Sequence, residues 1–471
     1  MKTTKYLFAG LLMLSVSTQS FAQDAKKVDE LTKIIAENKN NPAATKAVVK
    51  NYMKLNKKDA VAVAALGKAF LNLDDMTNAT EYANLAIKAN KHHAAGYLLR
   101  GDIAVAKDNG GEAATWYQNA MLMAPNTPEG YIKYARIYQK VDAEGAVATL
   151  EKLRTIDPNY LVDAEIGYMY SKNGQLQKAV EAYDKVRNIE SMENYMISDY
   201  ASSSMILGQT EKSLKVALAG VNKAPRNAGF NRIAFYDYTD LKDYDNALLF
   251  ANNLFNNSDS VKVLPSDYKY YAHALKGAGR HEEAIQNFLK VYELDNNEKE
   301  ALKLVSDVYR EQKDYPKALE YYNQYFNAVS PKRASDFTAL ARIYMDQAEN
   351  ATDDAGKKEA LLNADKVYSD LAEAMPNNLD YATYNRAHVY YMLNPDMKIG
   401  AAKPYYEKYA ELLEAKTERS NAENSTLAEA CNYLAVHYIQ NNNVQMAKVY
   451  AAKLQELRPD DDTAAKILSI K

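Results

Sequence analysis

Apolar residues recur along this chain at spacings of three and four positions, in short stretches separated by polar turns. This spacing is typical of an amphipathic helix with one buried face. Residues 93–126 contain two such stretches, with a break at Asn109-Gly110-Gly111 between them and a stop at Pro125. Glycine and proline interrupt helices at such points. The pattern therefore predicts pairs of short helices, and it recurs roughly every 34 residues.

Small residues occupy one position in each predicted helix, because two helices approach closely only where side chains are short. We call the position in the first helix the A-slot; it holds Gly67, Gly101, Ala135, Gly167, Ala201, Phe235 (the one large exception), Ala272, Ser306, Ala341, Ala387 and Ala435. The position in the second helix is the B-slot; it holds Ala79, Ala113, Ala146, Ala179, Ser213, Ala247, Ala284, Ala318, Ala364, Ala402 and Ala447. Large aromatic residues follow both slots in many repeats, and most of the 38 tyrosines are expected to fill packing positions.

This period and these slots resemble those of the tetratricopeptide repeat family over almost the whole chain. The resemblance implies an all-α solenoid, a right-handed superhelix in which each helix pair packs on its neighbours. We expect an N-terminal helical cap over residues 23–58 and an array of about eleven repeats over residues 59–471. The polar stretch Ala348–Lys357 is expected to form a surface loop, and residues 416–426 a polar link.

The N-terminus has the features of a secretory signal peptide. Lys2 and Lys5 precede an apolar run of about 11 residues, and the small residues Ser20 and Ala22 follow it. The run is too short to span a bilayer, and cysteine is absent directly after it, unlike in a bacterial lipoprotein. We expect cleavage after Ala22, release into the periplasm, and no transmembrane segment in the mature chain.

Composition argues against several function classes. The net charge is −3, which lacks the basic surplus that nucleic-acid binding requires. Cys431 is the only cysteine and is expected to be a buried packing residue. The six histidines are scattered without ligand spacing, and no phosphate-binding loop or nucleophile motif occurs. We therefore expect no metal, no cofactor and no catalytic residues, and thus not an enzyme.

The resemblance also implies where a partner would bind, since the concave face of such arrays is built by the first helices of the repeats. The family's two-carboxylate clamp for chaperone peptides is absent, because the corresponding positions include Ala64, Leu98 and Asp102. Other exposed first-helix positions map to Arg136, Gln139, Lys140, Tyr168, Lys172, Tyr195 and Ser198 in repeats three to five. The candidate peptide-binding residues are a basic track with two adjacent rings, and an aromatic patch further on: Arg232, Tyr236, Lys269, His273, Lys276, Lys303 and Arg310, then Tyr384, His388 and Tyr391.

The sequence thus favours a periplasmic scaffold that binds a protein or peptide partner, with possible roles in envelope assembly or secretion. A basic groove could take an acidic or extended peptide by charge and stacking. The alternative for the same residues is an ordinary solvated face. The alternative function is a glycan-binding accessory protein of nutrient uptake, although the lipobox cysteine and long loop insertions of such proteins are absent.

Overall fold

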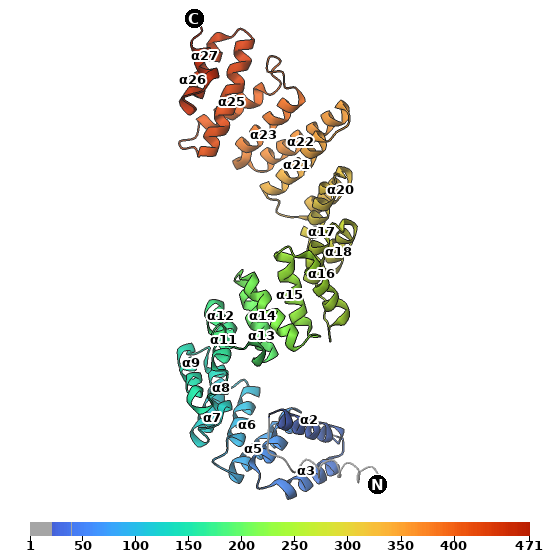
Figure 1. Cartoon of the computed structure of the whole chain (residues 1–471), viewed down its shortest axis with the longest axis vertical. Coiled ribbons are helices and arrows are strands. Elements are labelled where there is room, and N and C mark those ends of the chain that lie inside the picture. The colour runs from blue at the N-terminus through green and yellow to red at the C-terminus, as the bar shows by residue number, and fades with distance from the viewer. Residues whose placement is uncertain (1–20, 39) are drawn as a thin grey trace. The chain divides into compact units, whose positions relative to one another are not determined.

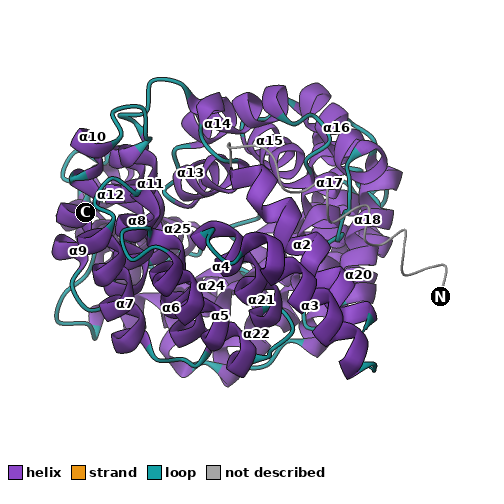
Figure 2. Ribbon diagram, turned by 90° about the horizontal axis from the view of Figure 1, so that it is seen from below, coloured by secondary structure: helices purple, strands orange, loops and turns teal. Residues whose placement is uncertain are grey.

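The structure is a computed structural model that describes residues 21–38 and 40–471. Helices joined by turns make up this part of the chain, and it contains no strand (Figure 2). The predicted all-α architecture is confirmed. The predicted leader lies outside the described residues, except for its last two, which begin the first helix.

The chain divides into two compact units. Figure 1 colours the chain by residue number, so the residues of each unit can be found by the colour bar. Unit 1 comprises Met1–Leu241 with Asn256–Ser260, and unit 2 comprises Lys242–Phe255 with Val261–Lys471. Each unit is described separately.

Unit 1 begins with two helices, followed by helices that pack in consecutive pairs. Its elements are α2 (Phe21–Glu37), α3 (Pro42–Asn56), α4 (Ala60–Leu71), α5 (Met76–Ala89), α6 (Ala94–Ala106), α7 (Gly110–Met123), α8 (Pro128–Tyr138), α9 (Ala143–Glu151), α10 (Leu153–Ile156), α11 (Val162–Lys172), α12 (Leu176–Tyr183), the 3-10 helix η2 (Ile189–Ser191), α13 (Asn194–Ile206), α14 (Thr210–Lys223) and α15 (Ala228–Asp240).

Unit 2 continues with the same kind of helix pairs. Its elements are α16 (Tyr244–Asn252), α17 (Pro265–Gly277), α18 (His281–Leu294), α19 (Glu300–Glu311), α20 (Tyr315–Ala328), α21 (Ala334–Glu349), α22 (Asp354–Ala374), the 3-10 helix η4 (Pro376–Asn378), α23 (Leu379–Leu393), α24 (Lys403–Glu414), α25 (Asn421–Gln440), α26 (Val444–Leu457) and α27 (Asp462–Leu468). The π-helix η3 (Asn253–Asn257) directly follows α16, and its last two residues are assigned to unit 1.

The small residues at the slots allow the two helices of each pair to pack closely. Every B-slot residue is 0% exposed. The A-slot glycines lie against large side chains of the array: a Cβ on Gly67 would come within 2.6 Å of Leu99, and a Cβ on Gly167 within 2.8 Å of Tyr183. The exception Phe235 is also fully buried. Small residues at these positions therefore set the distance between neighbouring helices.

Two stretches that were expected to be irregular are partly helical in the structure. Most of Ala348–Lys357 is helical, since α21 runs to Glu349 and α22 begins at Asp354. The cause is a helix cap: the Asp353 side chain accepts a hydrogen bond from the Gly356 amide at 2.7 Å. Only a short turn separates these two lengthened helices.

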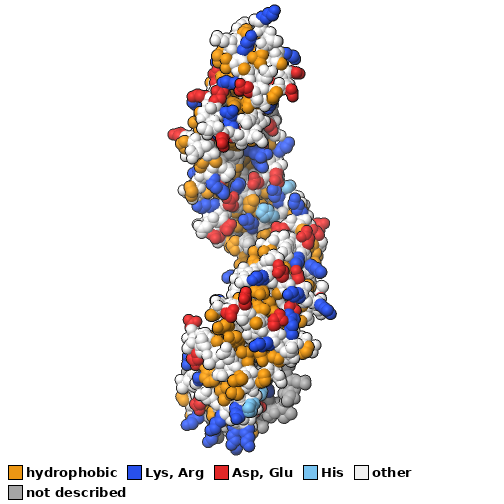
Figure 3. Space-filling model, turned by 90° about the vertical axis from the view of Figure 1, so that its left-hand side faces the viewer, with side chains coloured by type: hydrophobic (Ala, Val, Ile, Leu, Met, Phe, Trp, Pro, Cys, Tyr) orange, Lys and Arg blue, Asp and Glu red, His pale blue; other side chains and the backbone are white. Residues whose placement is uncertain are grey.

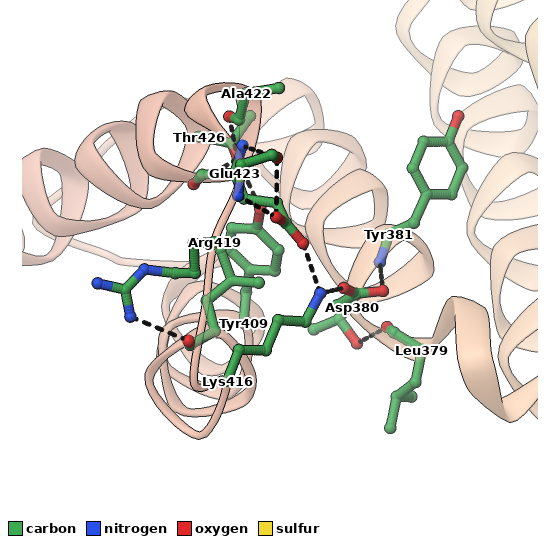
Figure 4. A network of polar contacts seen from close by, with 12 residues as sticks. Leu379, Asp380, Tyr381, Tyr409, Lys416, Arg419, Ala422, Glu423 and Thr426 are labelled. Carbon is green, nitrogen blue, oxygen red and sulfur yellow. Dashed lines mark hydrogen bonds and ion pairs between the residues drawn. The ribbon is translucent and has the colours of Figure 1, made fainter.

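The second half of the expected link at 416–426 is also helical, because α25 begins at Asn421. Ser420 and Glu423 form a capping box, in which each side chain accepts a hydrogen bond from the other residue's backbone amide. The ammonium of Lys416 donates to both Glu423 and Asp380, so one lysine joins α23 to the start of α25 (Figure 4). The polar composition of this stretch therefore serves capping and pairing rather than a disordered link.

Candidate functional site

The first helix of each pair is called the A helix and the second the B helix. In unit 1 the A helices α8, α11 and α13 bring together four residues, which we call the Tyr168 cluster: Arg136, Tyr168, Lys172 and Tyr195. The Lys172 ammonium lies 4.7 Å from the centroid of the Tyr168 ring, and the Arg136 guanidinium carbon lies 5.6 Å from it. Tyr195 meets the same ring edge-on at 5.0 Å. Three consecutive repeats thus contribute to one aromatic and cationic surface.

Both cations of the Tyr168 cluster are anchored by carboxylates that lie deeper in the fold. Arg136 pairs with Glu165 at 2.9 Å and also donates to the Tyr195 hydroxyl at 3.0 Å. Lys172 pairs with Asp199 at 2.9 Å. The carboxylate side chains are only 5% and 9% exposed, whereas the Arg136 and Lys172 side chains are 42% and 47% exposed. The cluster therefore presents positive charge to solvent and keeps its negative charge inside.

The pKa values in the cluster follow from this arrangement. Burial opposes the charged form of Arg136, but Glu165 and the Tyr195 hydroxyl outweigh it and raise the pKa of the guanidinium. The hydrogen bond to Asp199 raises the pKa of Lys172. Both cations therefore remain charged at neutral pH, and their charges are held in fixed positions.

The same kind of pairing recurs earlier in unit 1, at Asp102 on α6. Lys68 on α4 lies 2.9 Å from this carboxylate, Lys133 on α8 also pairs with it, and the Tyr117 hydroxyl donates to it at 2.9 Å. Burial works against the ionised form of Asp102, but Lys133 and Lys68 lower its pKa below the ordinary value. We call the pairings at Asp102, Glu165 and Asp199 the carboxylate ladder of unit 1.

The first pair of candidate residues, on α15, lies differently from the expectation. Tyr236 is only 7% exposed and packs edge-on against Phe235 at 5.3 Å. The expectation of an exposed ring at this position is wrong, because the Tyr236 ring packs in the core beside the large A-slot residue Phe235. Arg232 is half-buried.

The candidate residues of α17 and α19 form pairs within unit 2. Lys276 bonds Glu311 at 2.7 Å, Arg310 bonds Asp346 at 3.0 Å, and Lys303 lies 3.8 Å from Glu300. These three cations are therefore not a run of unpaired positive charge. On the face drawn in Figure 3, blue and red side chains are likewise intermixed rather than separated by sign.

The two remaining candidates of α17, Lys269 and His273, are half-buried. The His273 ring packs edge-on against Phe288 at 5.0 Å. Burial, together with the nearby Lys276 and Lys269, lowers the pKa of His273 below its ordinary value, so the ring is neutral at pH 7. It would offer a partner an aromatic edge and a hydrogen bond rather than charge.

The aromatic patch on α23 gathers around one carboxylate of α25. Glu429 accepts a hydrogen bond from the Tyr384 hydroxyl at 2.8 Å and lies 3.0 Å from His388 Nε2. His388, then Tyr384, lower the pKa of Glu429, although burial acts in the opposite direction. Tyr391 packs instead against Tyr433, at 6.0 Å. The structure thus brings Tyr384 and His388 together, with their polar atoms directed to an internal partner.

Three further features bear on the expected classes. Among the residues that the structure describes, no group of three His, Cys, Asp or Glu side chains is arranged to hold a metal ion. Within the same residues, no helix combines the length and apolarity needed to cross a bilayer. Cys431 is buried, and this burial raises the pKa of its thiol to about 12.

Sequence reasoning mapped the four residues of the Tyr168 cluster to the A-helix face but chose other residues as candidates. The candidates were the residues where Lys and Arg are densest. The sequence does not show that Arg136 and Lys172 pair with buried acids. One signal was available, because Tyr168 directly follows an A-slot, where the neighbouring repeats have Arg136 and Ser202. An aromatic ring at an exposed position between cations is a better indicator of a binding surface than charge alone.

Comparison with known proteins also identifies the tetratricopeptide repeat in this chain. The model of the tetratricopeptide repeat matches residues 164–189 and 271–298. The chain is similar to the photosystem I assembly protein Ycf3 of Rippkaea orientalis, with 30% identity over 132 residues, which cover 25% of this chain and 76% of that protein. It is also similar to tetratricopeptide repeat protein 1 of Schizosaccharomyces pombe, with 22% identity over 293 residues, which cover 62% of this chain and 26% of that protein.

Among solved structures, the C-terminal part of a TPR repeat-containing protein from Cytophaga hutchinsonii aligns with a TM-score of 0.47 and 21% identity, covering 58% of this chain and 100% of that one. The two stretches matched by the repeat model cover most of the pair α11–α12 and most of the pair α17–α18. The slot pattern, the helix pairs, the repeat-model matches and the similarity to Ycf3 lead to one conclusion: the chain belongs to the tetratricopeptide repeat family.

Proposed function

We propose that this protein is an exported scaffold that binds protein or peptide partners through the A-helix face of its repeats. Repeats of this family are generally non-catalytic and mediate protein–protein interactions, and we expect no catalytic residues here. The leader predicted from residues 1–22 supports a periplasmic location, in which the partner would belong to an envelope or secretion complex.

The observation that carries the proposal is the Tyr168 cluster. Its cations are exposed, charged and fixed by buried carboxylates, so binding costs little side-chain ordering. The Tyr168 ring between them offers a flat apolar surface of the kind found at interaction hot spots. These features fit an extended segment of a partner that carries a carboxylate beside an aromatic or apolar side chain.

The basic track remains a weaker candidate for the same function. Lys276, Lys303 and Arg310 pair with acids that are themselves 49%, 49% and 30% exposed, so negative charge reaches solvent on the same surface, unlike the nearly inaccessible acids of the Tyr168 cluster. The patch at Tyr384 and His388 has the same disadvantage, because Glu429, which bonds Tyr384 and lies 3.0 Å from His388, is 42% exposed.

The test is retention of envelope proteins on the immobilised chain. We expect wild type to retain a defined set of partners and the double variant Tyr168→Ala, Lys172→Met to lose them, with helicity unchanged. The matched control is Lys317→Met on α20, since Lys317 also lies 5.0 Å from a tyrosine ring and has an acidic neighbour, but is located on a B helix. The control should retain the same proteins as wild type.

Identical retention by wild type and the double variant would remove the A-helix face of repeats three to five from consideration. Retention on polysaccharide without any protein partner would instead support the glycan-binding alternative. A partner titration at low and high salt adds a second readout, because exposed charges are screened over about 8–10 Å near physiological ionic strength.

A further inference from the structure

Tyrosine hydroxyls donate hydrogen bonds to carboxylates in many repeats, and a cation accompanies these bonds. Tyr183, for example, donates to Asp199 at 2.9 Å, and Lys172 pairs with the same carboxylate at 2.9 Å. The following carboxylates each accept a hydrogen bond from a tyrosine hydroxyl and form an ion pair with a Lys or Arg: Asp102, Glu165, Asp184, Asp199, Glu300, Asp336, Asp365 and Glu407. At all these positions tyrosine, acid and cation occur together.

Glu429 on α25 departs from this pattern. Its carboxylate accepts hydrogen bonds from the Tyr384 hydroxyl at 2.8 Å and from the Tyr406 hydroxyl at 3.2 Å. Within the described residues no Lys or Arg forms an ion pair with it, and the basic residue beside it is His388, which is charged only when it is protonated. His388, then Tyr384, lower the pKa of Glu429, so the carboxylate is ionised at neutral pH. We call Tyr384, His388, Tyr406 and Glu429 the Glu429 site.

The other charges of the two A helices that carry this site are paired. Asp380 on α23 and Glu423 on α25 share Lys416 (Figure 4). Arg386 on α23 pairs with Asp365 at 2.6 Å. Among the Asp, Glu, Lys and Arg residues of α23 and α25, both of which the structure describes in full, Glu429 alone has no permanent counter-charge.

The elements around the site do not supply the missing cation. The charged residues of α24 pair with one another or with α26: Lys403 with Glu407, Lys408 with Glu411, and Glu414 with Lys453. The link before α25 contains one further charge of each sign, Glu418 and Arg419. On α21, Arg342 and Glu349 are exposed and unpaired, again with opposite signs. The negative charge of Glu429 therefore remains without compensation.

Aromatic rings lie around this carboxylate. The Tyr384 ring centroid is 4.5 Å from that of His388 and 5.0 Å from that of Tyr409. The Tyr406 ring lies 6.3 Å from His388. The side chains of His388 and Glu429 are 39% and 42% exposed, so a ligand can reach both from solvent. A cation within about 6 Å of a ring centroid is attracted to the face of the ring.

Arginine fits this combination of rings and carboxylate better than lysine does. A guanidinium is planar, so it stacks on a ring while it donates two hydrogen bonds to a carboxylate, and it is less strongly hydrated than an ammonium. The chain contains such an arrangement on the same helix, since Arg386 lies 4.9 Å from the Tyr405 ring centroid and donates to Asp365 at 2.6 Å. A carboxylate has about four acceptor positions, so the two tyrosine bonds leave room for further donors at Glu429.

We propose that the Glu429 site binds an arginine side chain of a partner protein. The guanidinium would donate to the Glu429 carboxylate and lie against the rings of Tyr384 and His388. The exposed acid that disfavours a partner's carboxylate at this patch is the group that selects a cation. The inference rests on the proposed function only in assigning the arginine to a protein partner, because the site lies in unit 2 and does not involve the Tyr168 cluster.

The experiment uses the full mature chain with carbon-13-labelled histidine, so that the NMR signal of His388, assigned with His388→Gln, reports binding. The ligand is a capped peptide of about seven residues with one central arginine between uncharged residues. We expect a saturable shift of the His388 signal. The same peptide with citrulline, which has the shape of arginine without its charge, should bind at least about tenfold more weakly. A lysine peptide should bind severalfold more weakly.

Variants of the chain test the role of the carboxylate. Glu429→Gln should weaken binding of the arginine peptide at least about tenfold, with helicity and melting temperature unchanged. Glu414→Gln is the matched control, because Glu414 is 40% exposed but already pairs with Lys453, and it should leave binding unchanged. Tyr168→Ala should also leave binding unchanged, so this inference and the function proposed for the Tyr168 cluster fail separately. Arg342→Gln should not weaken binding.

Equal binding of the arginine and citrulline peptides to wild type would overturn the proposal, and this comparison decides the matter even if Glu429→Gln is unstable. Equal binding by wild type and a folded Glu429→Gln chain would also overturn it. Ethylguanidinium that binds as tightly as the peptide would mean that the site takes a free organic cation. A concentration-dependent dimer that Glu429→Gln abolishes would mean that the arginine belongs to a second copy of the chain. Either result would overturn the assignment to a partner protein.

Discussion

Tyr117 packs its ring against the backbone of Gly101 so closely that a Cβ at Gly101 would lie 2.2 Å from the ring carbon Cε1. Tyr117 cannot easily move away, because it is buried and its hydroxyl donates to Asp102 at 2.9 Å. We expect Gly101→Ala to lower the free energy of unfolding by about 1–3 kcal/mol through overpacking. Chemical denaturation followed by circular dichroism measures this change.

The matched control for this substitution is Gly111→Ala in the first turn of α7. A Cβ at Gly111 would meet only the Asn109 side chain, at 4.0 Å. Alanine favours the helix over glycine by up to about 1 kcal/mol. Gly111→Ala should therefore leave stability unchanged or raise it, and a loss equal to that of Gly101→Ala would contradict the packing explanation.

Asp237 makes the stability of unit 1 depend on pH. Its carboxyl is fully buried, and neither oxygen makes a well-formed hydrogen bond within the described residues. Burial raises its pKa to about 7, while Ser213 and Asp240 act in opposite directions on it. The folded chain therefore binds this proton more tightly than the unfolded chain, whose aspartates have a pKa of about 3.9.

We expect the free energy of unfolding to decrease as pH rises from about 4 to about 7 and to level off above that. Each pH unit in this window corresponds to at most about 1.4 kcal/mol. Denaturation at a series of pH values should show this slope in wild type and its loss in Asp237→Asn. Asp29→Asn, at an exposed position on α2, should keep the wild-type slope.

Lys416 should control the ionisation of Glu423 at the start of α25 (Figure 4). The hydrogen bond from Lys416, followed by those from Ser420, lowers the pKa of Glu423 to about 2. The stabilisation from this carboxylate is therefore present above the ordinary glutamate pKa and is lost as pH falls towards 2.

Lys416→Met should shift the pKa of Glu423 upwards, towards the ordinary value, as measured by an NMR titration. Arg419→Met serves as the control, because Arg419 bonds the Leu413 carbonyl and the Asn424 side chain rather than Glu423. An unchanged pKa in Lys416→Met would mean that the capping box alone sets the ionisation of this residue.

Export can be tested directly on the protein as produced in a Gram-negative host. We expect a mature chain that begins at Gln23 and is released from the periplasm by osmotic shock. Mass determination of the purified protein checks the cleavage position. A chain that retains Met1, or that stays with the membranes after a salt wash, would contradict the leader assignment.

The helix pairs could be predicted because the B-slot rule is local. A small residue such as Ala113 or Ala318 is required wherever two helices touch, so its spacing appears in the sequence regardless of what surrounds it. Helix ends were less predictable. Asp353 and Ser420 cap helices that begin inside polar stretches, and composition does not reveal these hydrogen bonds.

The candidate site was harder to predict, for a physical reason. Lys172 and Lys276 look alike in the sequence, since each lies on an A helix and is followed by acids further along the chain. What distinguishes them is the burial of the partner: Asp199 is nearly inaccessible, whereas Glu311 is about half exposed. Burial of a side chain in the next repeat depends on packing that no single repeat encodes.

The carboxylate ladder also limits how this array can change through evolution. Asp102 forms ion pairs with Lys68 of the preceding repeat and Lys133 of the following repeat. Glu165 forms an ion pair with Arg136 of the preceding repeat. Deleting the repeat that contains α8 would remove Arg136 and leave the nearly inaccessible Glu165 carboxylate without its cation, which typically costs about 3–5 kcal/mol. Arrays of this kind are often regarded as strings of exchangeable parts. In this stretch the parts have a fixed order, and recombination between repeats would be selected against even where every slot residue is preserved.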